Sequence, residues 1–187
     1  MKSAMSTSRM VSFIGITLLS LTIIGCDQPT TAAGGETVPL GDVIIEQQYT
    51  NAAWAFILRG SVVDASGMVR TYEMHEAVRL PEMEKDGTWS SDSLMKKYLL
   101  NDTIRASVPA DTLVRLLQFA AQVEEKTMSD TMHVGADMGM QTLVIYRKDP
   151  ATGRYRRILI TQSGDFQCRN TSAAAEEVRR WAERHLP

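Results

Sequence analysis

The sequence predicts an α+β fold: an antiparallel sheet of two hairpins with helices packed on one face, in the order ββαββα. Two observations favour this fold. Turn sequences at 64–67 and 149–153 each separate runs rich in strand-forming residues, as the turns of β-hairpins do. Two further segments repeat apolar residues at helical spacing. An antiparallel sheet covered by helices on one face satisfies the layer rule for compact domains.

The first hairpin is expected in the N-terminal half of the domain. Val43 to Tyr49 is rich in branched residues and predicts a lead-in strand, while Trp54, Phe56 and Leu58 lie two apart, as on a half-buried strand. The turn "DASG" ends in Gly67, which can supply the positive φ that a tight hairpin loop requires. We therefore expect a hairpin around this turn.

Two helices are expected between the hairpins. A short one is predicted at 94–100, and a longer one begins near Pro109 and Asp111, residue types that suit a first helical turn. The longer helix has the i, i+3, i+4, i+7 spacing of a stripe that faces a core. The residues of this stripe are Leu113, Leu116, Leu117 and Ala120.

The C-terminal part predicts a loop, a second hairpin and a last helix. Residues 127–140 form the loop, and the hairpin has "DPATG" at its tip, where Pro150 needs no ladder donor. Thr171 or Ser172 can cap the last helix. Its inward-facing residues are Val178, Trp181 and Ala182.

Composition places the chain among ordinary globular proteins and disfavours one class of partner. Its 187 residues are 44% hydrophobic and 22% charged, with a formal net charge of −2, enough for one domain with a packed core. Nucleic-acid binding needs a concentrated basic face. The one basic cluster, Arg154, Arg156 and Arg157, lies on an expected strand and is typical of a solvated sheet face. We expect no nucleic-acid partner.

The N-terminus has the three parts of a secretory signal. Lys2 and Arg9 precede an uncharged apolar run of 14 residues, Val11 to Ile24, which is followed by Gly25 and Cys26. Such a run is short for a membrane-spanning helix, which needs about 20 residues, and has the length of a signal-peptide core.

The tetrapeptide "IIGC" at 23–26 resembles the lipobox of bacterial lipoproteins. The resemblance implies lipidation of Cys26 and cleavage between Gly25 and Cys26. The chain would then comprise a signal peptide at 1–25, a lipidated flexible tether at 26–41 and a single α+β domain at 42–187. It also implies a protein anchored in the bacterial cell envelope and facing the periplasm or the exterior, because several acyl chains hold a protein on a membrane durably.

Two further resemblances concern the domain. "NAAWAF", "GMVRTYE" and "GDFQCRNTSAAAEEVRRWA" are similar to segments of uncharacterised secreted and lipid-anchored bacterial proteins. The expected ββαββα order, with "GAD" before the second hairpin, resembles emfourin-type domains, whose founding members inhibit thermolysin-like metallopeptidases. This second resemblance is architectural, and a shared fold does not transfer a function.

Three patterns in the sequence have residue types that could carry chemistry. Cys168, Asp165 and His185 have the residue types of a thiol mechanism, but a lone cysteine most often packs as a small hydrophobe. The loop 128–140 contains four methionines and His133, ligand types that suit Cu(I), although methionine is also a common packing residue. Adjacent glutamates on the helices diverge and cannot form an acid–base pair. We therefore expect no catalytic residue, no bound metal and no cofactor.

These observations predict a lipid-anchored extracytoplasmic domain that is not an enzyme and acts by binding. Its expected partners are the membrane, through the N-terminal lipid, and a protein such as a secreted peptidase, which it would inhibit. The alternative is an extracytoplasmic Cu(I)-binding protein that uses the methionine-rich loop 128–140.

Overall fold

The computed structural model describes residues 42–53, 55–75, 83–98 and 102–187. The predicted signal peptide, the cleavage and lipidation positions Gly25 and Cys26, and most of the predicted tether lie outside these residues, as does Trp54. Within the described residues, no helix is both long enough and apolar enough to span a bilayer.

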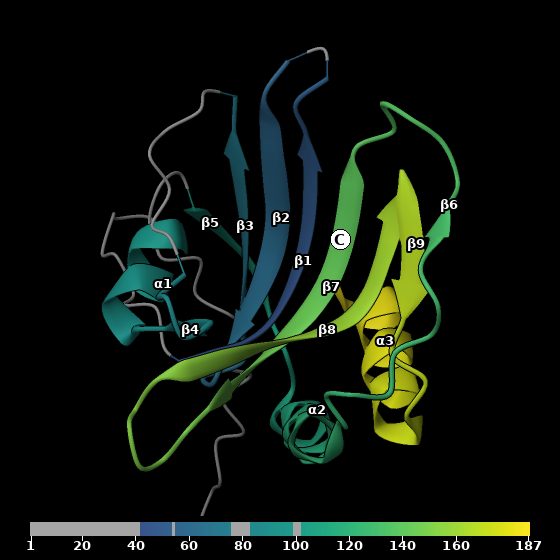
Figure 1. The fold of residues 1–187 in the computed structure, drawn as a ribbon. Helices are drawn as coiled ribbons and strands as arrows, with labels where there is room; N and C mark the ends of the chain where they lie inside the picture. The colour runs from purple at the N-terminus through teal and green to yellow at the C-terminus, as the bar shows by residue number, and fades with distance from the viewer. Residues whose placement is uncertain (1–41, 54, 76–82, 99–101) are drawn as a thin grey trace, which may run out of the picture. The chain divides into compact units, whose positions relative to one another are not determined.

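The described chain forms one antiparallel sheet with three helices (Figure 1). The spatial order of the strands is β5-β3-β2-β1-β7-β8-β9-β6, and the short β4 pairs with β8. The strands are β1 Val43–Asn51, β2 Ile57–Asp64, β3 Met68–Met74, β4 Thr88–Trp89, β5 Asp102–Ser107, β6 Met132–His133, β7 Met140–Lys148, β8 Tyr155–Gly164 and β9 Phe166–Arg169. The helices are α1 Ser91–Tyr98, α2 Ala110–Gln122 and α3 Ala173–His185.

The α+β class is confirmed, and the sheet is larger than two hairpins. The lead-in strand is β1, and the two expected hairpins are β2–β3 and β7–β8. The simple ββαββα order is not confirmed, because β4, β5, β6 and β9 add to the sheet. These strands have two to six residues, too few for a clear alternating pattern.

Aspartates fix both predicted turns. Asp64 Oδ1 accepts hydrogen bonds from the backbone N–H groups of Ser66 (2.9 Å) and Met68 (3.1 Å), and Gly67 has φ +83°. Asp149 Oδ1 accepts from the N–H of Ala151 at 2.8 Å. An Asx turn of this kind substitutes for backbone hydrogen bonds where the chain reverses. Gly67 therefore has the left-handed conformation that the sequence predicts for it.

The helices α2 and α3 pack together on one face of the sheet. Leu116 is fully buried as predicted, but Leu117 is 41% exposed, so the predicted stripe is one residue too wide. Ser172 caps α3 by accepting from the N–H of Ala175. Arg147 on β7 donates to the carbonyls of Ala120 and Val123 at the end of α2, which satisfies acceptors that a helix end leaves free. The core here comprises Ile44, Ile45, Val63, Val69, Leu116, Val123, Leu143, Ile145, Ile158, Ile160, Ala175, Val178, Trp181 and Ala182.

The helix α1, which is not one of the two helices of the predicted ββαββα order, packs on the opposite face of the sheet from α2 and α3. Successive residues of a strand point to opposite sides, and Val144 packs with α1 whereas Ile145 packs with α2 and α3. The second core comprises Val43, Leu58, Val62, Tyr72, Met74, Trp89, Leu94, Tyr98, Val144, Tyr146 and Tyr155. The sheet is therefore buried on both faces near its centre.

Candidate functional site

The sheet face that carries α2 and α3 changes from apolar to polar along the strands. Ile45, Val63, Val69 and Ile145 are neighbours in the register and form an apolar row in the helix-covered core. Two residues further along β1, and again two beyond that, the same face presents polar side chains. We call these the polar rows. The first contains Gln47, Ser61, Thr71 and Thr103, and the second contains Gln141, Tyr49, Arg59 and Glu73.

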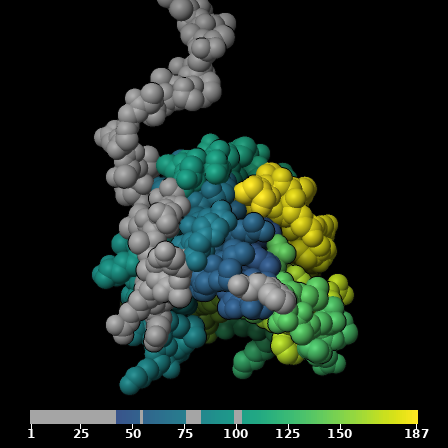
Figure 2. Space-filling model, turned by 90° about the horizontal axis from the view of Figure 1, so that it is seen from above, coloured from purple at the N-terminus to yellow at the C-terminus, as the bar shows by residue number. Residues whose placement is uncertain are grey.

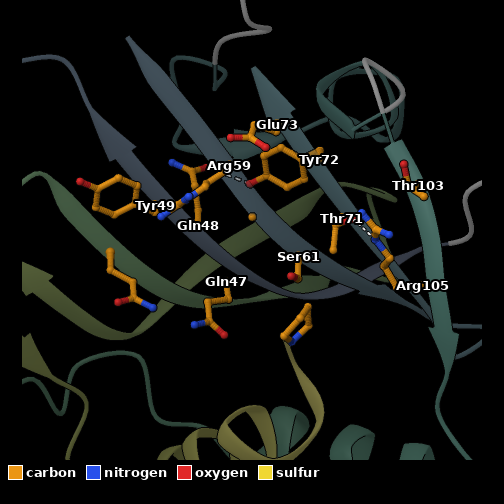
Figure 3. A pocket seen from close by; sticks show the side chains of 13 residues that line it. Gln47, Gln48, Tyr49, Arg59, Ser61, Thr71, Tyr72, Glu73, Thr103 and Arg105 are labelled. Atoms are coloured by element: carbon orange, nitrogen blue, oxygen red, sulfur yellow. Dashed lines mark hydrogen bonds between the residues drawn. The ribbon is translucent and has the colours of Figure 1, made fainter. Parts of the chain in front are cut away.

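The polar rows line a concavity of about 830 Å³ (Figure 3). Arg105 on β5 and Pro187 beyond α3 also border it. In Figure 1, α2 and α3 lie against one half of the sheet, and the other half of β1 to β3 extends beyond them. A volume of this size lies within the range of small-ligand pockets, about 300–1,000 Å³. We call this surface the polar concavity.

Two guanidinium groups face the concavity without a carboxylate partner. The Cζ of Arg59 lies 5.2 Å from the centre of the Tyr49 ring, and Arg105 Nε donates to Thr71 Oγ1 at 3.0 Å. Neither arginine forms an ion pair with any residue that the structure describes. Glu73 is the one carboxylate on the polar rows, and its Oε1 lies 3.4 Å from His75 Nε2.

Several neutral groups of the concavity also have unused hydrogen-bonding capacity. The side chains of Gln47, Ser61 and Gln141 make no hydrogen bond within the described part of the chain. A carboxamide offers one acceptor oxygen and two donor hydrogens, and a hydroxyl offers both functions. Together with the two arginines, these groups can bind a polar ligand at several points.

A second group of polar residues is buried on the opposite face. The carboxylate of Glu46, which is fully buried on β1, accepts from Lys97 Nζ at 2.9 Å through each oxygen. Tyr72 Oη donates to Oε1 at 2.6 Å, Tyr146 Oη donates to Oε2 at 2.8 Å, and Tyr98 Oη donates to Tyr146 Oη at 3.0 Å. We call these five residues the Glu46 cluster. It joins β1, β3, β7 and α1.

The pKa values in the Glu46 cluster follow from burial and pairing. Burial raises the pKa of Glu46, but attraction to Lys97 and the hydrogen bonds from Lys97, Tyr72 and Tyr146 outweigh it and hold the pKa below its ordinary value. Burial lowers the pKa of Lys97, which the nearby carboxylate opposes. Burial and then the charge of Glu46 raise the pKa values of Tyr72, Tyr98 and Tyr146 well above the ordinary range.

Gly60 leaves the space that this arrangement needs. It is the direct neighbour of Tyr72 on β3. A Cβ atom at Gly60 would lie 2.7 Å from Tyr72 Oη and 2.3 Å from the carbonyl oxygen of Gln47, both shorter than van der Waals contact. The absence of a side chain therefore lets the Tyr72 hydroxyl reach Glu46.

The Glu46 cluster is structural, although perturbed pKa values often mark functional sites. Both oxygens of Glu46 are occupied by donors, and the residue has no exposed surface. The Lys97 ammonium also lies 5.1 Å from the Tyr98 ring centre and 5.5 Å from that of Trp89. A ligand has no access to a carboxylate enclosed in this way.

The structure does not assemble the thiol pattern Cys168, Asp165 and His185. Cys168 is buried on β9, and Asp165 Oδ1 accepts from the N–H of Met138. His185 ends α3, whose 13 residues at about 1.5 Å rise place it roughly 18 Å beyond the helix start that follows β9. Its ring lies 4.9 Å from that of Trp181. The three side chains have separate structural roles.

The methionine-rich loop is more exposed than the packing role of methionine suggests, and part of it is a short strand. It contains β6, which pairs with β9, and Met132, Met138 and Met140 are 39–59% exposed rather than packed under the sheet. Figure 2 shows this segment, in green, at the surface. Met132 and His133 are adjacent on a strand and point to opposite sides, which disfavours a shared ion. Among the described residues, no group of three or more His, Cys, Asp or Glu side chains could hold a metal.

Neither the polar concavity nor the Glu46 cluster is among the sites that the sequence predicts. The concavity has a sequence signal, because Gln47 and Tyr49 continue the alternation of Ile45 on β1 with polar side chains. Arg59 and Arg105 belong to strands that are distant in sequence, so only the pairing of β2, β3 and β5 shows that they share a face. A glutamate after three apolar residues gave no indication of a buried partner 51 residues away.

Comparison with known proteins identifies no family for this chain: no family model, no curated protein and no solved structure matches it.

The Glu46–Lys97 pair predicts strong energetic coupling. Glu46→Gln or Lys97→Met alone leaves one charge buried without its partner, and we expect each to lower the free energy of unfolding by about 3–5 kcal/mol. The loss in free energy of unfolding of the double variant should be smaller than the sum of the two single losses by at least about 2 kcal/mol. Urea unfolding of the four proteins measures this. For the exposed pair Arg180–Glu177, the same cycle should give about 1 kcal/mol or less, and equal coupling in both cycles would contradict the assignment.

The lowered pKa of Glu46 predicts a pH dependence of stability. Because the folded-state pKa lies below the ordinary value of 4.5, the ionised carboxylate stabilises the fold above about pH 4.5, and this contribution is lost as the pH falls through the folded-state pKa. Protonated glutamic acid and glutamine are similar in shape. The difference in free energy of unfolding between wild type and Glu46→Gln should therefore shrink with acidification. A difference that stays constant from pH 6 to pH 3 would be incompatible with this assignment.

Proposed function

We propose that this chain is a lipid-anchored extracytoplasmic protein that acts by binding, without catalysis, and that the polar concavity is its ligand site. The observation that supports this most directly is the pair of arginines, Arg59 and Arg105, that face an open concavity and form no ion pair with a carboxylate of the described residues. Unpaired charged groups that converge on a concave surface are typical of binding sites.

The proposed anchor rests on the sequence of the N-terminus. A charged start, an apolar run of 14 residues and a lipobox-like "IIGC" occur in the order and at the spacing of a lipoprotein signal. Lipidation of Cys26 would make residues 26–41 the tether of the domain. A secreted peptidase remains the protein partner suggested by the emfourin-like resemblance, and inhibition would be the effect of binding it.

Replacing Cys26 tests the anchor. In cells grown with labelled palmitate, we expect the wild-type protein to carry the label, to lack residues 1–25 and to sediment with membranes. The Cys26→Ser variant should carry no label and keep its N-terminal segment, because the lipid is attached to the thiol. The Cys168→Ser variant is the matched control and should be labelled like the wild type. An unlabelled wild-type protein that retains residues 1–25 would refute the anchor.

Photo-crosslinking tests the proposed binding site. We place p-benzoylphenylalanine at Gln141, an exposed residue of the polar rows, and, as a control, at Lys96, an exposed residue of α1 on the opposite face. Irradiation of intact cells should give a discrete adduct from position 141 that is absent from position 96. No adduct at 141, or the same adducts at both positions, would rule out the concavity as the ligand site.

A further inference from the structure

The two arginines of the polar concavity are suited to carboxylates. A guanidinium is planar, always charged and able to donate two parallel hydrogen bonds to one carboxylate. Arg59 and Arg105 are both exposed, and their contacts with Tyr49 and Thr71 do not neutralise their charge. Glu73, the one carboxylate on the rows, is the cross-strand neighbour of Arg59, and its Oε1 lies 3.4 Å from His75 Nε2. Two guanidinium charges against one carboxylate leave a net positive charge, so the concavity favours an anion.

A β-bulge positions Arg105. In the pairing of β3 with β5, Val69 is opposite Ala106 and Arg70 is opposite Ile104, so Arg105 is the extra residue between two successive pairs. Bulges occur preferentially at sheet edges and beside binding sites, where they change the direction of a side chain. Here β5 is the edge strand, and Arg105 reaches Thr71 on the polar rows. The bulge therefore lies at one of the two arginines of the concavity.

The spacing of the two arginines matches an extended chain. β2 and β5 are separated by β3, which places Arg59 and Arg105 about 10 Å apart across the strands at about 4.8 Å per strand. Along the strands, Arg59 is at the level of Glu73 and Arg105 is at a level between Val69 and Arg70, roughly 12 Å away at about 3.3 Å per residue. The diagonal between the two Cα positions is about 15 Å, and the long arginine side chains can adjust this to the roughly 13 Å between residues i and i+4 of an extended peptide.

The neutral groups favour a peptide over a glycan. The unused carboxamide of Gln47 complements the N–H and C=O groups of a peptide backbone. Tyr49 supplies the aromatic ring of the polar rows, and the guanidinium of Arg59 already lies over it. The described rows thus offer no free aromatic platform for a sugar ring.

We propose that the polar concavity binds an extended acidic peptide segment whose carboxylates, four residues apart, pair with Arg59 and Arg105. This inference rests on the proposed binding function and names its ligand class. A segment of this kind on the surface of a protein partner would be recognised by its charge spacing and its exposed backbone.

Peptides of defined charge spacing test the inference on the full-length lipoprotein purified in a neutral detergent. The probe is acetyl-Glu-Thr-Ser-Thr-Glu-amide. One control replaces both glutamates by glutamine, and a second, acetyl-Thr-Glu-Glu-Ser-Thr-amide, has the same charge with adjacent glutamates. Titration calorimetry at low salt should show the probe binding at least about tenfold more tightly than either control, because only the probe reaches both arginines.

Substitutions identify the contacts. Arg59→Gln and Arg105→Gln should each weaken binding of the probe about tenfold or more, a loss typical of one charged hydrogen-bonded contact. Arg156→Gln, at an exposed arginine that pairs with Glu125, should leave binding unchanged. Equal affinity for the probe and its glutamine control, or affinity unaffected in both Arg59→Gln and Arg105→Gln, would overturn the inference. So would tighter binding of trigalacturonate, an acidic glycan, than of the probe.

The crosslinking experiment separates failure of this inference from failure of the proposed function. If the adduct at position 141 persists in the double variant Arg59→Gln/Arg105→Gln, the concavity binds a ligand that does not depend on these arginines, and only the acidic-peptide assignment falls. If the adduct is lost in the double variant and the probe binds as expected, both stand.

Discussion

The carboxylate of Glu46, buried in the central strand β1, is the constraint on which one face of the sheet depends. A buried charge is tolerated only when it is paired and hydrogen-bonded, and Glu46 obtains its donors from β3, β7 and α1. The helix α1 has only eight residues, too short to be stable alone in water. The ion pair between Lys97 and Glu46 therefore fixes the position of α1 on the sheet. Gly60 leaves the space that the Tyr72 hydroxyl needs to donate to the same carboxylate.

On the other face, the position of the candidate site follows from where the helices end. The same strands bury an apolar row under α2 and α3 and present the polar rows beyond them. An antiparallel sheet with one solvated face would show polar side chains there in any case. The polar concavity differs from an ordinary solvated face in three respects: its described lining contains no lysine, its two arginines form no ion pair with a described carboxylate, and a β-bulge lies at one of them.

Local sequence patterns predicted the elements whose signals are local. The turns at Asp64 and Asp149 have strong turn residues, α2 has an apolar period, and α3 has both an apolar period and the Ser172 cap; these are the features that the structure confirms. The edge strands are too short to show a period, and the partner of α1 is a charge far along the chain. The candidate site is also non-local, because Arg59 and Arg105 meet only through pairing with β3.

Side chains in rows on one face of a sheet suit the binding of an extended ligand. Catalysis by nucleophile and base requires two or three groups to converge on one atom within about 3 Å. Side chains on one face of adjacent strands project side by side, about 4.8 Å apart across strands and about 6.6 Å apart along them. Such an array contacts an extended ligand at many separate points. The spacing of Arg59 and Arg105 therefore suits recognition of charges along a chain, which is the basis of the proposed ligand class.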